Sequence, residues 1–173
     1  MSLFFPTLYR RRITDVTAED LRRLGAACVL LDVDNTLTTH DAPELEPAVM
    51  AWLDAMREEF KLVVVSNNNA ERVAPFAEKI GLPFHAKACK PLPGGFWEAG
   101  AEQQMAAEEC VVIGDQIFTD MLGANLAGMK SILLEPIEPE TKQKFIVFKR
   151  KIERPMLNSR KQRARKERDY GER

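Results

Sequence analysis

Two carboxylates stand two residues apart at the end of an apolar segment. Asp32 and Asp34 follow Cys28–Leu31 and lie in the string Asp-Val-Asp-Asn-Thr. In an extended chain such side chains point to the same side, where they would repel each other. A divalent cation bound by carboxylate and backbone oxygens would remove that repulsion. The same string is also typical of an acidic turn whose Asp and Asn cap the backbone, so the string alone leaves both open.

Two further polar signals follow later segments of the chain. Ser66 and Asn67 come directly after Leu62–Val65, where they could contact an anion or simply cap the next helix. Lys90 follows a weaker strand predicted near Phe84–Ala86. It could neutralise a phosphate, although a lone lysine is usually solvated. Each signal is weak by itself.

The last signal is a glycine followed by two spaced acids. Gly114 would let the backbone turn close to a ligand. Asp115 could complete an oxygen-rich metal site, and Asp120 could orient a lysine or a metal-bound water. The alternative is a Gly-Asp turn with an acid in the first turn of a helix.

The segments between these signals predict the elements that position them. Strands apolar on both faces, separated by helices, predict a three-layer, Rossmann-like α/β fold with a buried parallel sheet of about five strands. Ligands in such sheets bind past the carboxyl ends of the strands, where every polar signal falls. The predicted strands are Cys28–Leu31, Leu62–Val65, Phe84–Ala86, Cys110–Ile113 and Ser131–Leu134. The predicted helices are a first one capped by Thr17 and ended by Gly25, then Glu46–Glu58, Asn69–Ile80, Phe96–Met105 and Thr119–Ala127.

Length and charge divide the chain into a body and a tail. We expect one domain over residues 1–140 and a basic tail over 141–173. The tail has 13 lysines and arginines against four acids, whereas the rest has 12 against 22. Such a tail could meet nucleic acid, a membrane surface or the body itself, or it could be a solvated end. No apolar run reaches membrane-span length, no secretory signal is present, and three scattered cysteines fit a reducing cytosol.

The order of the signals along the chain, DxDxT, Ser, Lys and GDxxxxD, resembles the haloacid dehalogenase (HAD) superfamily of phosphohydrolases over about residues 26–135. The resemblance implies that Asp32 is the nucleophile, Asp34 the general acid/base and Lys90 a catalytic and phosphate-binding cation. It implies Mg²⁺ bound by the Asp32 side chain, the Asp34 backbone carbonyl and Asp115. The substrate-binding residues expected on this basis are Thr36, Ser66, Asn67 and Lys90, and Asp120 is the second acid of its motif.

Four short sequence motifs narrow the resemblance to one group within this superfamily. DVDNTL, VSNN, AxKP and GDQIFTD are similar to the YqeG group of subfamily IIIA, which is itself similar to phosphatidylglycerophosphate phosphatases. The resemblance implies a lipid phosphomonoester as substrate. Only 29 residues separate Thr36 from Ser66 and 23 separate Ser66 from Lys90, which leaves no room for a cap domain. The site should be open, so the substrate, a membrane or a second subunit must help to exclude water.

The termini have an interfacial composition. Leu3–Tyr9 precede three arginines, and Phe145, Phe148 and Ile152 fall on one helical face among basic residues. A basic amphipathic helix can lie on anionic lipid, so we expect a cytoplasmic protein that can bind the inner membrane face. Alternatively, the aromatic residues pack under the sheet and the tail covers the acidic body.

Other functions stay open at this point. The chain could hydrolyse a soluble or nucleic-acid-end phosphomonoester. Nucleic acid is the less favoured partner, because the sequence contains no aromatic-interleaved RNA-binding motif. It could also be a non-catalytic binding module with a vestigial site. Trp52 and Trp97, both on predicted helices, are expected to anchor those helices in the core.

Overall fold

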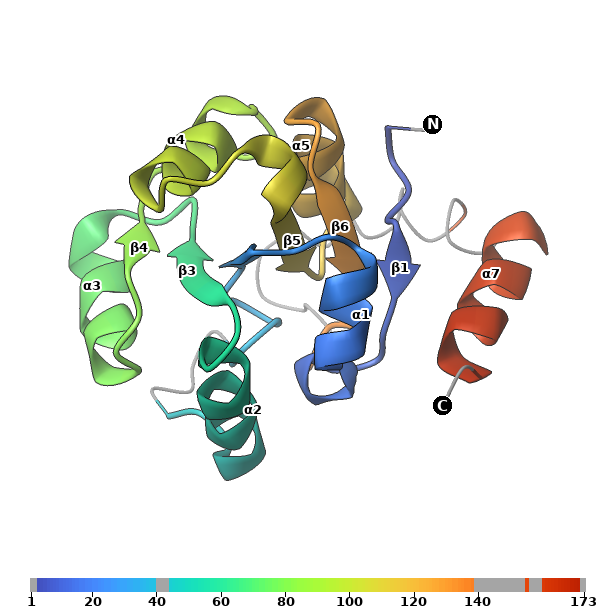
Figure 1. The fold of residues 1–173 in the computed structure, drawn as a ribbon, viewed down its shortest axis with the longest axis horizontal. Coiled ribbons are helices and arrows are strands. Elements are labelled where there is room, and N and C mark those ends of the chain that lie inside the picture. Colours follow the sequence, from blue (N-terminus) through green and yellow to red (C-terminus); the bar gives the residue numbers. More distant parts are fainter. Residues whose placement is uncertain (1–2, 40–43, 139–154, 156–159, 172–173) are drawn as a thin grey trace.

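A six-stranded parallel sheet organises the molecule (Figure 1). The computed structural model describes residues 3–39, 44–138, 155 and 160–171. The sheet has the order β1-β6-β5-β2-β3-β4, and every pair of neighbouring strands is parallel. The strands are β1 (Leu8–Tyr9), β2 (Cys28–Leu31), β3 (Lys61–Val65), β4 (Phe84–His85), β5 (Cys110–Gly114) and β6 (Lys130–Leu133). The α/β prediction is therefore confirmed.

The sheet has one strand more than the five predicted. The additional strand, β1, has only two residues and pairs with β6 at one edge, with Leu8 opposite Ile132. Hydrogen bonds to β6 extend on both sides, since the Thr7 N–H donates to Ser131 O at 2.9 Å and the Arg10 N–H donates to Leu133 O at 3.1 Å. A two-residue strand has no periodicity of its own, because its identity comes from a partner more than 120 residues away.

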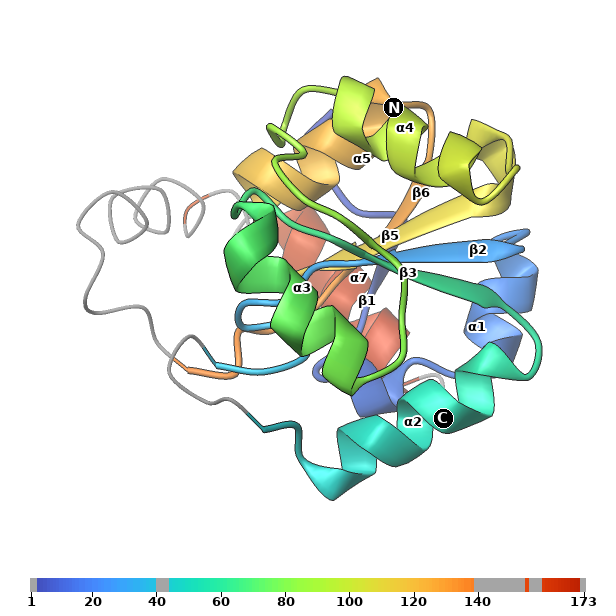
Figure 2. The same ribbon diagram turned by 90° about the vertical axis from the view of Figure 1, so that its left-hand side faces the viewer.

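Helices cover both faces of the sheet (Figure 2). The helices α1 (Ala18–Arg23), α2 (Pro47–Arg57) and α3 (Ala70–Lys79) pack on one face, and α4 (Gly94–Glu102) and α5 (Leu122–Leu126) pack on the other. Successive strand residues face opposite layers: Val29 contacts the first core, whereas Leu30 contacts the second. Because both faces are buried, the central strands are apolar without alternation.

The helix predictions hold with local corrections. Thr17 caps α1 as expected, since its hydroxyl accepts a hydrogen bond from the Asp20 N–H at 3.1 Å. The helix expected over Thr119–Ala127 is instead a π-helical turn, η3 (Ile117–Met121), followed by the short α5. Trp52 is buried, but Trp97 is half exposed and reaches only the edge of the core, where its indole N–H donates to Ala127 O at 3.0 Å. The core role predicted for Trp97 is wrong.

Both ends of the described chain pack on the β1 edge. The helix α7 (Arg160–Gly171) lies beside β1 (Figure 1), and the Tyr9 N–H donates to the Asp169 carboxylate at 3.2 Å. Lys166 forms an ion pair with Glu135 at 2.7 Å. The sequence left several partners open for the basic tail, and the structure shows that α7 contacts the body. Phe145, Phe148 and Ile152 lie outside the described residues.

The N-terminal aromatic residues also pack against the body. Tyr9 is fully buried, and the Phe4 ring meets the Phe118 ring edge-on with 5.8 Å between centroids. Among the described residues, none of the helices combines the length and the hydrophobicity needed to cross a bilayer.

Candidate active site

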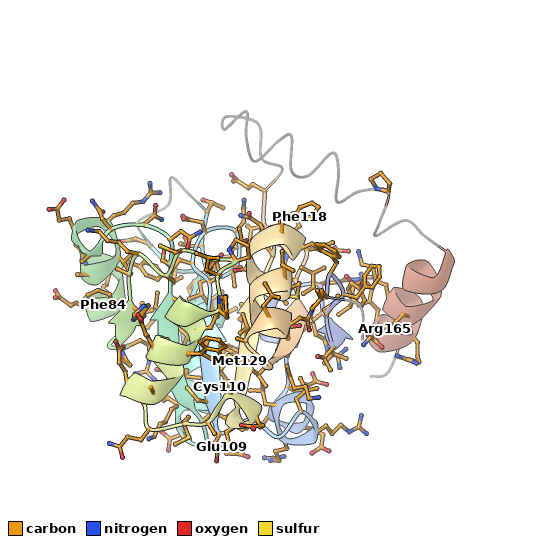
Figure 3. All side chains as sticks on the ribbon, turned by 90° about the horizontal axis from the view of Figure 1, so that it is seen from above. Phe84, Glu109, Cys110, Phe118, Met129 and Arg165 are labelled. Atoms are coloured by element: carbon orange, nitrogen blue, oxygen red, sulfur yellow. The ribbon has the colours of Figure 1, made fainter. Side chains whose placement is uncertain are left out.

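The predicted polar residues follow the strands at one edge of the sheet. Asp32 continues the line of β2, where its N–H donates to Ile113 O of β5 at 3.0 Å. Ser66 continues β3 in the same way, and its N–H donates to His85 O at 3.0 Å. Figure 3 labels Glu109, which precedes β5, and Phe118, which follows it, at opposite ends of the molecule. The site lies toward the Phe118 end, because parallel strands present their carboxyl ends together.

Lys90 is the central cation of the site. Its Nζ donates to Asp32 Oδ1 at 2.6 Å, to Asp120 Oδ1 at 2.7 Å and to Val65 O at 3.2 Å, and its side chain is only 3 % exposed. Burial alone would lower the pKa of Lys90, but the carboxylates of Asp120 and Asp32 outweigh it and raise that pKa above the ordinary value. The ammonium group is therefore a fixed positive charge.

Asp32 combines burial with two strong neighbours. The pKa of Asp32 is raised to about 6, because desolvation and the negative charge of Asp120 together outweigh the lowering by Lys90. Its second oxygen, Oδ2, accepts a hydrogen bond from the Thr36 hydroxyl at 3.4 Å. Both carboxylate oxygens of Asp32 are thus held in place, while 12 % of the side chain stays accessible.

The loop that presents Lys90 is held by Asn67. The Asn67 carbonyl oxygen accepts from the Lys90 N–H at 2.6 Å, and its amide donates to Lys90 O at 3.1 Å. The following Lys90–Pro91 peptide bond is cis. The side chain of Asn67 therefore positions the lysine, and its predicted contact with substrate stays a prediction.

Asp115 and Asp120 bring further carboxylates to the site. One oxygen each from Asp32, Asp115 and Asp120 lies within 4.8 Å of the other two. Three hard oxygen donors at this spacing suit a magnesium ion, which favours carboxylate and water ligands. The predicted metal set contains two of these acids, whereas the metal role predicted for Asp34 concerns its backbone carbonyl. Asp120, expected to orient a lysine, contacts Lys90 directly.

Position 114 requires a glycine because there is no space for a side chain. A Cβ atom there would lie 2.4 Å from Cγ of Asp120, so a side chain cannot fit without displacing that acid. The Asp120 carboxylate is also fixed by the Gln116 N–H at 3.1 Å. We expected Gly114 to allow close approach of a ligand, but its neighbour is the carboxylate that anchors Lys90.

Asp34 faces a different neighbourhood from Asp32. The Asn68 amide donates to Asp34 Oδ2 at 3.0 Å, and Arg72 Nη2 lies 3.7 Å from Asp34 Oδ1. The Ser66 hydroxyl accepts from the Asn68 N–H at 3.2 Å. Asp34 and Ser66 together line a pocket of about 370 Å³. Asn68 and Arg72 were missed in the sequence, where the Asn-Asn-Asn run was a signal for Asn68 and nothing pointed to Arg72.

No cap domain is inserted in the described segments on either side of Ser66. Within residues 44–60 and 67–89, the only helices are α2 and α3, which belong to the core layer, so no cap domain is inserted there. This agrees with the capless prediction. The turn after β2 is short, with the backbone of Asn35 at φ +63° and its N–H donating to Thr38 O at 2.7 Å.

One family model and several solved structures match this chain. The HAD-hydrolase-like family matches residues 88–135, which include Lys90, Asp115 and Asp120. Among solved structures, a HAD phosphatase from Thermococcus onnurineus superimposes with a TM-score of 0.54 at 15% identity, over 67% of this chain and 89% of that one. At this identity the structural match shows the fold alone.

Sequence relatives define the family more narrowly. The probable phosphatase YqeG of Bacillus subtilis strain 168 is 38% identical over 93% of this chain and 94% of its own length. The chloroplastic phosphatidylglycerophosphate phosphatase 1 of Chlamydomonas reinhardtii is 28% identical over 88% of this chain and 60% of its own length. The chain therefore belongs to the YqeG-type phosphatases of the HAD superfamily and is a phosphohydrolase.

Proposed function

We propose that the chain hydrolyses a phosphomonoester through a phosphoryl group transferred to Asp32, with Mg²⁺ as cofactor. The observation that supports this most directly is the buried contact of Lys90 with Asp32 and Asp120 beside Asp115. A carboxylate held next to a fixed cation is a nucleophile whose attack on a phosphate dianion meets less repulsion.

In the first proposed step, an Asp32 oxygen attacks phosphorus while the ester oxygen leaves in line. Asp34 donates a proton to that leaving oxygen, and the product is an aspartyl-phosphate on Asp32. In the second step, Asp34 removes a proton from water, which attacks the same phosphorus. The bond from phosphorus to the Asp32 oxygen breaks, which releases inorganic phosphate and restores the Asp32 carboxylate. Asp34 suits both steps because it lines the pocket next to Ser66 and is partly exposed.

The remaining residues bind and neutralise the phosphoryl group. Lys90 stays protonated throughout and offsets charge on the phosphoryl oxygens. Thr36 provides a hydroxyl in contact with Asp32, and Ser66 provides one in the pocket that Asp34 also lines. Asp32, Asp115 and the Asp34 carbonyl would hold Mg²⁺, with Asp120 next to them. When bound, Mg²⁺ would lower the repulsion between the carboxylates and the incoming phosphate.

We further propose that the substrate is the headgroup of phosphatidylglycerophosphate. An open site can accept a phosphate that remains attached to a membrane lipid, and a relative bears this activity in its name. The proposal also includes contact of the basic tail with an anionic membrane surface, because the tail has a strong excess of lysine and arginine.

Phosphate release tests the proposal. Purified protein is incubated with phosphatidylglycerophosphate in vesicles, with and without Mg²⁺, and with a panel of soluble phosphomonoesters. We expect Mg²⁺-dependent release that Asp32→Asn abolishes. Turnover by Asp32→Asn equal to that of the wild type would refute the nucleophile, and faster turnover of a soluble sugar or nucleotide phosphate would refute the lipid substrate. The absence of any turnover would favour a binding module.

A further inference from the structure

A second binding feature lies beside Asp34. The pocket of about 370 Å³ extends from Asp34 and Ser66 along α3. Its α3 wall combines the basic side chain of Arg72 with the apolar side chains of Val73 and Phe76. This volume is in the range of small-molecule binding sites. None of the steps proposed above uses the α3 wall.

The position of Arg72 relates this wall to the reaction. Arg72 Nη2 lies 3.7 Å from Asp34 Oδ1, which is an ion pair but too long for a hydrogen bond. Its guanidinium is half exposed, so its N–H groups can turn toward an anion. Asp34 is the proposed proton donor to the leaving oxygen. A cation next to that donor therefore lies where the leaving group, and not the transferred phosphoryl group, would be bound.

We propose that Arg72 and the α3 wall bind the leaving group and select one that carries a second negative charge, such as a phosphodiester about one glycerol unit from the scissile ester. The Arg72 guanidinium would bind the second anionic group, and Val73 and Phe76 would contact the carbon chain between the two charges. This inference rests on the phosphatase activity proposed above. It assigns Arg72 as a specificity-determining residue and not as a catalytic one.

Charge in the rest of the pocket is consistent with this role. Lys79, one helical turn beyond Phe76 on the same wall, adds a second cation and pairs with Glu44 at 3.4 Å. Arg72 forms an ion pair with Asp34, whose second oxygen is held by Asn68. A leaving group with a second negative charge would thus meet two cations along α3.

Two soluble substrates separate this inference from the proposed function. Glycerophosphoglycerol phosphate, the deacylated headgroup, has the phosphodiester, whereas glycerol 3-phosphate lacks it. We expect kcat/KM for the first to exceed that for the second by about tenfold, the contribution of a partly exposed charged hydrogen bond. Arg72→Gln should bring the ratio close to one, and Arg72→Lys should restore part of it. Arg23→Gln, an exposed arginine on α1, is the matched control and should keep the wild-type ratio.

Each outcome has a distinct meaning. If the wild type hydrolyses neither compound nor the lipid, the phosphatase proposal fails. If it hydrolyses both soluble compounds equally well, the phosphatase stands and the inference is overturned. A ratio that survives in Arg72→Gln also overturns it. With phosphatidylglycerophosphate in vesicles, Arg72→Gln should lose the same factor as with the deacylated compound, whereas a loss confined to the lipid would show recognition of acyl chains and contradict the role of Arg72.

Discussion

Replacement of Lys90 by methionine tests the electrostatics of the site through stability alone. Methionine keeps most of the side-chain volume and removes the charge. In the wild type, the Lys90 ammonium lies 2.6 Å from Asp32 and 2.7 Å from Asp120, and all three groups are largely buried. Without it, two carboxylates that share one cation would face each other with no compensating charge among the contacts described.

The expected cost is large. Removal of one partner from a buried ion pair costs about 3–5 kcal/mol, and a chain of this size loses roughly 2–4 °C in Tm per kcal/mol. We therefore expect Lys90→Met to lower Tm by about 10 °C in the absence of divalent cations. The double variant Lys90→Met/Asp120→Asn should be more stable than Lys90→Met, because it also removes one of the opposing charges.

Thermal and urea unfolding followed by circular dichroism, with and without Mg²⁺, measure these effects. Mg²⁺ should stabilise Lys90→Met more than the wild type, because the ion would take over part of the lost compensation. Lys87→Met, an exposed lysine three residues earlier, is the matched control and should change stability by less than about 0.5 kcal/mol. A Lys90→Met protein as stable as the wild type in the absence of metal would refute the reasoning.

Three further predictions concern residues around the site and under β1. Burial raises the pKa of Asp20, but the hydrogen bonds and charge of Arg10, together with hydrogen bonds from Thr17, outweigh burial and lower that pKa. The resulting stability should be present above about pH 4 and lost at lower pH, and urea titrations should show this loss flattened in Asp20→Asn. Gly114→Ala should destabilise the fold by about 1–3 kcal/mol through its clash with Asp120, and calorimetry measures this. Asn67→Ala should lower kcat, because two hydrogen bonds that fix Lys90 in its proposed role are lost, and steady-state kinetics with an unchanged Mg²⁺ requirement would show it.

Each of these has a result that would contradict it. Identical pH–stability curves for the wild type and Asp20→Asn would remove the assigned role of the buried pair. A Gly114→Ala protein of wild-type stability would mean that Asp120 can move away at no cost. An Asn67→Ala enzyme with unchanged kcat would show that the lysine loop keeps its position without the side chain of Asn67.

The central sheet, and the acids and lysine at its edge, could be predicted from the sequence. Val29, Leu31 and their neighbours are apolar on both faces because helices cover both, and this continuous pattern is visible in the chain. Asp32 and Asp115 directly follow such runs, so the general rule on strand ends places them together.

Other features depend on contacts between distant segments and had no local pattern. The pairing of Leu8–Tyr9 with β6 requires a partner far along the chain. Arg72 is one of many surface arginines in the sequence, and only the folded structure shows it beside Asp34. Likewise, the requirement for Gly114 comes from the side chain of Asp120, six residues later, and not from the turn itself.

Rapid acid quench followed by peptide mass spectrometry shows whether Asp32 accepts the phosphoryl group. Protein is mixed with substrate and Mg²⁺, quenched within one turnover and digested. We expect a phosphoryl adduct on the peptide that contains Asp32. In Asp34→Asn the adduct, once formed, should decay more slowly, because the activation of water is lost. Turnover without any adduct on that peptide, together with activity retained by Asp32→Asn, would contradict it.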